Sequence, residues 1–80
     1  MVLTTHPVSG TNERFAFGSQ VTAYEIGGLP QGEHAVIAEF PDQGWRILRW
    51  NAAWHGNWTG NYISLDAAVQ ALREQLLATA

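Results

Sequence analysis

The C-terminal stretch of the chain constrains the fold more than any other, because its apolar residues recur at helical spacing along one side. Ser64 is a favourable N-cap, and Asp66 stands in the first turn, where the helix dipole favours an anion. The pattern predicts one amphipathic helix of roughly 13 residues after Ser64, whose apolar stripe must lie on a sheet or on a partner. The stripe consists of Leu65, Ala68, Val69, Leu72 and Leu76.

The remainder of the chain is typical of β-structure. Residues 15–26 are rich in Phe, Val, Thr and Tyr, and turn signals follow at 27–32 and 41–44. We therefore expect an α+β fold, an antiparallel β-meander of three or four strands with the helix across one face. The other strand candidates are residues 33–40, 45–51 and a last short strand near 57–63.

A chain of 80 residues suffices for one small domain. Residues 1–13 are polar, and we expect a mobile N-terminal arm there, with a short strand at Val2–Leu3. Residues 14–80 are expected to form the single α+β domain.

The segment 43–55 admits two interpretations. Asp42 as an N-cap and Gly56 as the residue after the last turn could bracket a helix that aligns three tryptophans. A strand is favoured, because Trp and Ile prefer strands and a glycine would otherwise occupy the first helical turn.

A hairpin around a four-residue loop, 41–44, accounts for more of the sequence. It places Phe40 opposite Trp45 and Glu39 opposite Arg46, so that an aromatic pair and an ion pair follow from one register. One face then carries Val36, Ala38, Phe40, Trp45 and Ile47, and the other carries Ala35, Ile37, Leu48 and Trp50, bordered by Glu39 and Arg46.

Both of these expected faces are apolar, although the one predicted helix can cover only one of them. The face with Ile37, Leu48 and Trp50 could be a docking surface, because a Trp among aliphatic residues beside an Arg and a Glu has the composition of an interface hot spot. Alternatively, the N-terminal arm or the segment 54–58 folds over this face, or two copies stack it in a homodimer.

The segment 54–62 interleaves three aromatic residues with Asn and Gly. Its rings could stack on a sugar, stack on single-stranded bases together with Arg46 and Arg49, or bind a protein. In an equally weighted interpretation, the segment is a turn into the last strand, with Trp58 and Tyr62 packed against the helix.

Composition argues against several function classes. Four Arg and no Lys against seven acidic residues give a net charge of −3, without the basic patch of a duplex-DNA binder. The absence of Cys excludes disulfides, zinc ribbons and thiol nucleophiles. His6, His34 and His55 lie in unrelated segments, so we expect no metal site. Glu33 and Glu39 are too far apart on one strand for a paired-carboxylate mechanism, and we expect neither catalytic residues nor a cofactor.

The N-terminus lacks a basic region followed by an apolar run. No apolar run approaches the roughly 18 residues that a membrane helix requires. The expectation is a cytoplasmic protein without a membrane partner.

These observations favour a non-catalytic protein-binding module over an enzyme. Small size and one adhesive face suit an inhibitor or accessory protein of a phage or mobile element, which would occlude a host protein complex. A nucleic-acid-binding sheet that uses Arg and Trp stacking is the first alternative, and a carbohydrate-binding module is the second. The expected partner-binding residues are Ile37, Glu39, Arg46, Leu48, Arg49, Trp50, Trp54 and Trp58.

Overall fold

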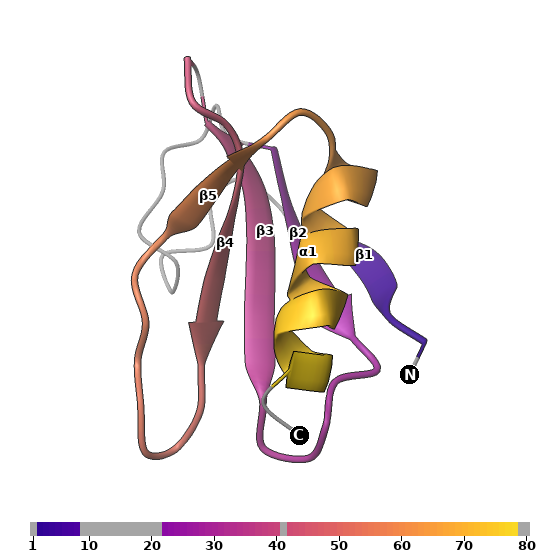
Figure 1. Cartoon of the computed structure of the whole chain (residues 1–80), viewed down its shortest axis with the longest axis vertical. Helices are drawn as coiled ribbons and strands as arrows, with labels where there is room; N and C mark the ends of the chain where they lie inside the picture. Colours follow the sequence, from indigo (N-terminus) through magenta and orange to yellow (C-terminus); the bar gives the residue numbers. More distant parts are fainter. Residues whose placement is uncertain (1, 9–21, 41, 79–80) are drawn as a thin grey trace.

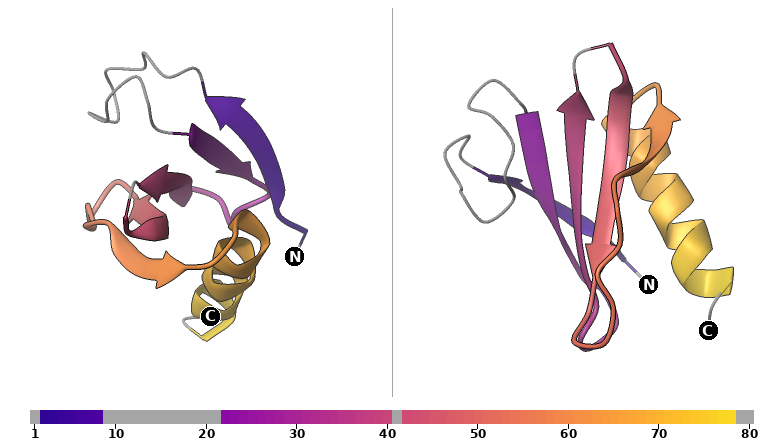
Figure 2. Two further views of the ribbon diagram at one scale, coloured as in Figure 1. Left: turned by 90° about the horizontal axis from the view of Figure 1, so that it is seen from above. Right: turned by 90° about the vertical axis from the view of Figure 1, so that its left-hand side faces the viewer.

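In the computed structural model, which describes residues 2–8, 22–40 and 42–78, five strands form one open antiparallel sheet in sequence order. The single helix of this part of the chain crosses one face of the sheet (Figure 1 and Figure 2). The expected α+β class is confirmed, whereas the expected number of strands, three or four, is too small. The elements are β1 (Thr4–Val8), β2 (Thr22–Gly27), β3 (His34–Phe40), β4 (Gly44–Trp50), β5 (Thr59–Tyr62) and α1 (Leu65–Ala78).

The additional strand, β1, comes from the segment in which an N-terminal arm is expected. It pairs antiparallel with β2, so that Thr5 lies opposite Ile26. The predicted position of a short strand at Val2–Leu3 is wrong, because β1 begins at Thr4. Four of its five residues are exposed, and such an edge strand lacks the apolar alternation by which a strand is detected in a sequence. Residues 9–21, with the rest of the expected arm and most of the first strand candidate, lie outside the described residues.

Helix α1 confirms the predicted helix and its N-cap. The Ser64 Oγ accepts a hydrogen bond from the N–H of Ala67 at 3.1 Å, which satisfies one of the amide groups left unpaired at a helix N-terminus. Ala68, Leu72 and Leu76 are buried, so the predicted stripe faces the sheet.

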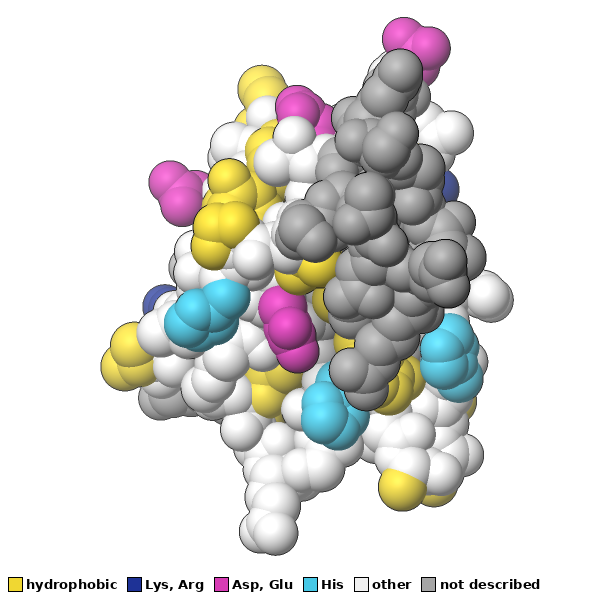
Figure 3. Space-filling view, turned by 180° about the vertical axis from the view of Figure 1, so that it is seen from behind, with side chains coloured by type: hydrophobic (Ala, Val, Ile, Leu, Met, Phe, Trp, Pro, Cys, Tyr) yellow, Lys and Arg dark blue, Asp and Glu magenta, His cyan; other side chains and the backbone are white. Residues whose placement is uncertain are grey.

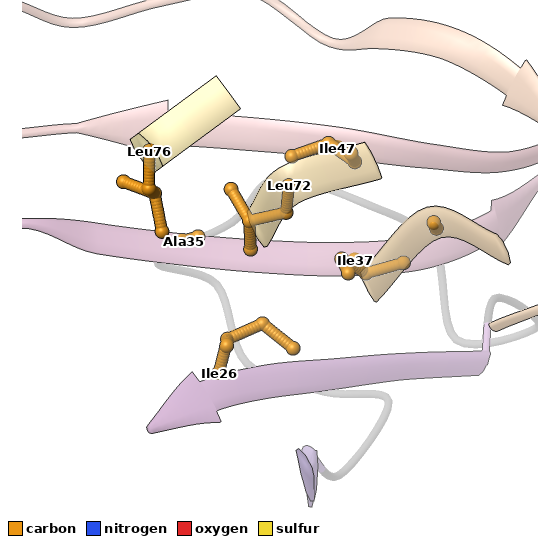
Figure 4. Packing of buried hydrophobic residues seen from close by; sticks show 7 residues of the cluster. Ile26, Ala35, Ile37, Ile47, Leu72 and Leu76 are labelled. Carbon is orange, nitrogen blue, oxygen red and sulfur yellow. The ribbon is translucent and has the colours of Figure 1, made fainter. Parts of the chain in front are cut away.

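The main core lies between α1 and strands β2, β3 and β4. Figure 4 shows Leu72 and Leu76 over the strands that carry Ile37 and Ile47. Ile37, Ile47 and Leu72 are at most 1% exposed. Each fully buried side chain of this kind stabilises the fold by roughly 1.5–3 kcal/mol.

The hairpin over β3 and β4 is confirmed, but its predicted register is wrong by one residue. Phe40 lies opposite Gly44, and Glu39 lies opposite Trp45 rather than opposite Arg46, so the expected cross-strand pairing of Glu39 with Arg46 does not form. The turn closes early because the N–H of Gln43 already donates to the Phe40 carbonyl oxygen at 3.2 Å.

Two left-handed residues explain the shorter turn. Asp42 has a φ of 66° and Gly44 a φ of 75°, and Asp and Gly tolerate this region better than other residues do. A Cβ atom on Gly44 would lie 2.7 Å from the Tyr62 carbonyl oxygen. Gly44 is therefore the first residue of β4, where its missing side chain admits β5, rather than the last residue of the loop.

A shift of one residue moves every side chain of β4 to the other face of the sheet. Ile47 consequently lies opposite Ile37 beneath the helix, and Leu48 lies opposite Val36 on the face that α1 does not cover. The predicted face that combines Ile37 with Leu48 and Trp50 does not exist. We call the side that α1 covers the helix face and the other side the opposite face.

Candidate functional site

The opposite face divides into two halves along the strands. In one half, Ala23, Val36 and Ala38 are at most 3% exposed and form a second apolar cluster. Phe40 and Trp58 pack against this cluster. Trp50 packs against the same cluster from the other half. Figure 3 shows histidine side chains (cyan) distributed across the opposite face, with an acidic side chain (magenta) among them.

Trp58 belongs to the first half, where the chain turns back over the sheet. Its ring meets that of Phe40 edge-on, with centroids 4.9 Å apart. The Arg46 guanidinium donates to the carbonyl oxygens of Trp58 at 3.1 Å and Gly60 at 3.0 Å, and to Gln43 Oε1 at 2.8 Å. Trp58 thus packs on the opposite face, so its expected packing against the helix is wrong, whereas Tyr62 does pack on the cluster beneath α1. Arg46 acts at Trp58 as a structural clamp.

Trp50 belongs to the second half, where it stands between two histidines. The His34 ring stacks on it with a centroid separation of 5.4 Å and an interplanar angle of 14°. His55 forms an isolated bridge with Trp50 on the other side, and the centroids of their two rings are 6.3 Å apart at an interplanar angle of 25°. Because imidazoles flank the indole from both sides, a sugar or a base has little access to its faces.

Beyond Trp50 the chain makes a closed turn, which we call the tip turn, residues 51–54. Asn51 and Trp54 exchange two backbone hydrogen bonds, of 2.8 and 3.4 Å. The Asn51 Oδ1 accepts the N–H of Ala53 at 2.9 Å, and its Nδ2 donates to the Glu33 carboxylate at 3.4 Å. This side chain thus fixes the turn from within and ties it to the start of β3.

Trp54 projects from the tip turn with 52% of its surface exposed. Its ring covers Gly56, where an added Cβ would lie 2.6 Å from the indole Cη2. The N–H of Gly56 donates to the Arg49 carbonyl oxygen at 2.9 Å, so the residue beneath the ring is itself held by the sheet. One side of the indole is therefore backed by the chain.

The structure does not bring all of the predicted binding residues together. Ile37 is buried under the helix, and Leu48, at 8% exposure, is buried on the opposite face. Glu39 is exposed, and Arg49 lies on the helix face, where it donates to Gln75 Oε1 at 3.3 Å. Of the predicted set, Arg46 and Trp58 are brought into contact with each other over the opposite face, and Trp50 and Trp54 flank the tip-turn end of the sheet.

Sequence reasoning missed His34, His55 and Gly56 as parts of this end. With the correct register, His34 falls opposite Trp50, and an isolated bridge joins Trp50 to His55. His34 was missed because the expected register places Ala35, not His34, opposite Trp50, whereas His55 and Gly56 are brought there by the tip turn.

The two arginines of the expected nucleic-acid platform lie on different faces of the sheet. Arg46 stands opposite Ala38, and Arg49 stands opposite Ala35, which belong to the two separate apolar clusters. Both guanidinium groups donate to acceptors within the chain. They cannot form one basic surface for a strand of nucleic acid.

Within the described ranges no three His, Cys, Asp or Glu side chains come close enough to hold a metal ion. No helix of these residues is long and apolar enough to span a membrane. Comparison of the chain with protein-family models, with curated proteins and with solved structures finds no match.

Proposed function

We propose that the chain is a non-catalytic protein-binding module that contacts its partner through the tip surface, formed by Trp54 and the neighbouring Asn51 and Glu33. The observation that carries this proposal is the indole of Trp54, half exposed and yet held in place by the tip turn and by Gly56. A small inhibitor or accessory protein that blocks a larger complex would use a contact of this kind.

An exposed tryptophan supported by the backbone is well suited to an interface. Trp is enriched among the residues whose truncation costs an interface most, because it offers a large contact area while few torsions lose freedom. The backbone hydrogen bonds between Asn51 and Trp54 order the turn before a partner binds, so binding costs less conformational entropy there.

A carbohydrate-binding module is the second candidate, and the same ring supports it. An indole that is backed on one side and exposed on the other can receive a sugar ring by stacking. Trp50 is unsuited to this role because His34 and His55 flank it. A glycan array probed with the wild type and the Trp54→Ala variant separates this candidate from protein binding.

The test of protein binding is a nuclease-treated capture from a lysate of the source cells, with wild type, Trp54→Ala and Leu77→Ala immobilised side by side. Leu77 is the matched control, because it is apolar and 58% exposed but lies on the helix. We expect one stoichiometric protein with the wild type and the control, and its loss with Trp54→Ala. Capture that survives in Trp54→Ala would reject the tip surface as the contact.

A further inference from the structure

The exposed charges of the described chain are of one sign. Among the described Asp, Glu and Arg residues, every exposed side chain is acidic, and the arginines are only half exposed. A surface of this kind attracts a positively charged partner and repels an acidic one. The exposed acidic residues are Glu25, Glu39, Asp42, Asp66 and Glu74, and the half-buried arginines are Arg46, Arg49 and Arg73.

Two of these arginines, Arg46 and Arg49, donate hydrogen bonds inside the fold. Arg46 donates to two backbone carbonyl oxygens and to Gln43. Arg49 lies on the helix face, and its hydrogen bond to Gln75 directs the guanidinium toward α1. Neither charge is offered to a partner at the tip surface.

A carboxylate is joined to the tip turn through Asn51, the residue that pairs with Trp54. Glu33 and Asn51 continue the β3–β4 register by one pair, and Asn51 is joined to Trp54 by backbone hydrogen bonds. The Asn51 Nδ2 stands 3.4 and 3.5 Å from the two Glu33 carboxylate oxygens, which are long contacts that leave the carboxylate able to accept stronger donors.

From this arrangement we infer that the partner is basic, and that it places an arginine side chain on the exposed side of Trp54 and a second basic group near Glu33. A guanidinium stacks favourably on an indole, and a carboxylate close by strengthens the attraction for cations. The inference rests on the proposed function and specifies the chemistry of the segment that the tip surface receives.

The experiment uses a heptapeptide of alternating Gly and Arg and a second peptide in which neutral citrulline replaces each Arg. Both are titrated into the ¹⁵N-labelled chain at low salt, and the indole N–H signal of Trp54 is assigned from the Trp54→Phe variant. We expect the Arg peptide to shift that signal and the backbone amides of residues 51–56. The citrulline peptide should bind about fivefold more weakly or less, as expected for the loss of a cation–π contact.

Four variants sharpen the test. Glu33→Gln should weaken binding of the Arg peptide about threefold, the size of a partly exposed ion pair. Trp54→Ala should weaken it about fivefold or more, with the backbone amides as the readout. Leu77→Ala should leave it unchanged, and Trp54→Phe should retain part of the binding. Thermal unfolding of each variant verifies that it is folded.

Equal binding of the two peptides, binding that survives in Trp54→Ala, or no shift at millimolar Arg peptide would each overturn the inference. The lysate capture separates this failure from a failure of the proposed function. If capture still depends on Trp54 while the Arg peptide does not bind, the tip surface is a protein contact and the basic partner is wrong. If capture does not depend on Trp54, the proposed function itself fails.

Discussion

The two faces of the sheet are covered by different means. On the helix face, α1 supplies an apolar stripe whose residues Ala68, Leu72 and Leu76 are buried. On the opposite face, the described cover includes an irregular segment that needs individual attachments, with Trp58 on Phe40 and Arg46 on two carbonyl oxygens. The helical repeat of apolar residues covers the helix face, whereas the described cover of the opposite face is held by individual side-chain contacts.

The same comparison explains why the candidate site lies at the end of the sheet. Beyond the reach of Arg46, the chain leaves the sheet at Trp50, makes the tip turn and returns at His55. This turn is closed by its own hydrogen bonds, so its one large apolar side chain, Trp54, is not needed to hold it. A ring that stability does not require is available for a partner.

Removal of helix-face packing should have the largest effect. Leu72→Ala deletes the side chain of a fully buried residue, and we expect a loss of about 3 kcal/mol in the free energy of unfolding. Urea denaturation followed by circular dichroism measures it. The control Leu77→Ala, on the exposed side of α1, should change stability by less than about 0.5 kcal/mol. A loss below about 1 kcal/mol for Leu72→Ala would mean that the helix face is not the main core.

Trp50→Ala tests how far the opposite face contributes to the fold. Trp50 is half buried, packs on the second apolar cluster and is flanked by His34 and His55. We expect a loss of about 2 kcal/mol, less than for a fully buried ring. His34→Ala, which removes one stacked partner, should cost about 0.5–1 kcal/mol. Equal losses for Leu72→Ala and Trp50→Ala would erase the difference between the faces.

Arg46→Met tests the clamp while it keeps an apolar stem of similar length. Loss of the charged donors to Trp58 and Gly60 should cost about 1.5 kcal/mol. Hydrogen exchange should show faster exchange of the amides of residues 58–60 than of those in α1. Arg49→Met, which removes only the long bond to Gln75, is the control and should cost less than about 0.5 kcal/mol. Similar exchange in both variants would contradict the clamp.

Trp54→Ala should have the smallest effect on stability, less than about 0.5 kcal/mol, because the bonds of the tip turn are made by the backbone and by Asn51. Its effect on partner capture is expected to be the largest of the series. Chemical denaturation and capture from the same preparations measure both quantities. A stability loss as large as that of Trp50→Ala would identify Trp54 as a packing residue.

Much of the fold could be predicted from local patterns. Ser64, Leu72 and the other positions of the stripe predict α1 and the face it buries, and the structure confirms them. The strands β3 and β4 follow from their residue types and flanking turns. The edge strand β1 could not be found in this way, because exposure on nearly every residue leaves no periodic signal.

The candidate site could be predicted only in part. The Asn- and Gly-rich segment 54–62 predicts a role for Trp54, and the expected hairpin face with Ile37 and Leu48 predicts one for Trp50, although that face does not form. Their different surroundings could not be identified, because neither the His34 stack nor the Gly56 support follows from spacing along the chain. Arg46 was assigned to a surface, whereas its acceptors are carbonyl oxygens contributed 12 and 14 residues later in the chain.

The helix, its N-cap and the α+β class depend on local patterns of apolar and polar residues, and these patterns can be read from the sequence alone. The register of β3 against β4 depends on the backbone at Asp42 and Gly44, and both adopt positive φ. At Gly44 the close approach of the Tyr62 carbonyl favours a residue without a side chain. Side chains alternate along a strand, so the register at Gly44 decides which residues of β4 face the helix. The contact between Gly44 and the Tyr62 carbonyl therefore also affects the positions of Trp50 and Trp54.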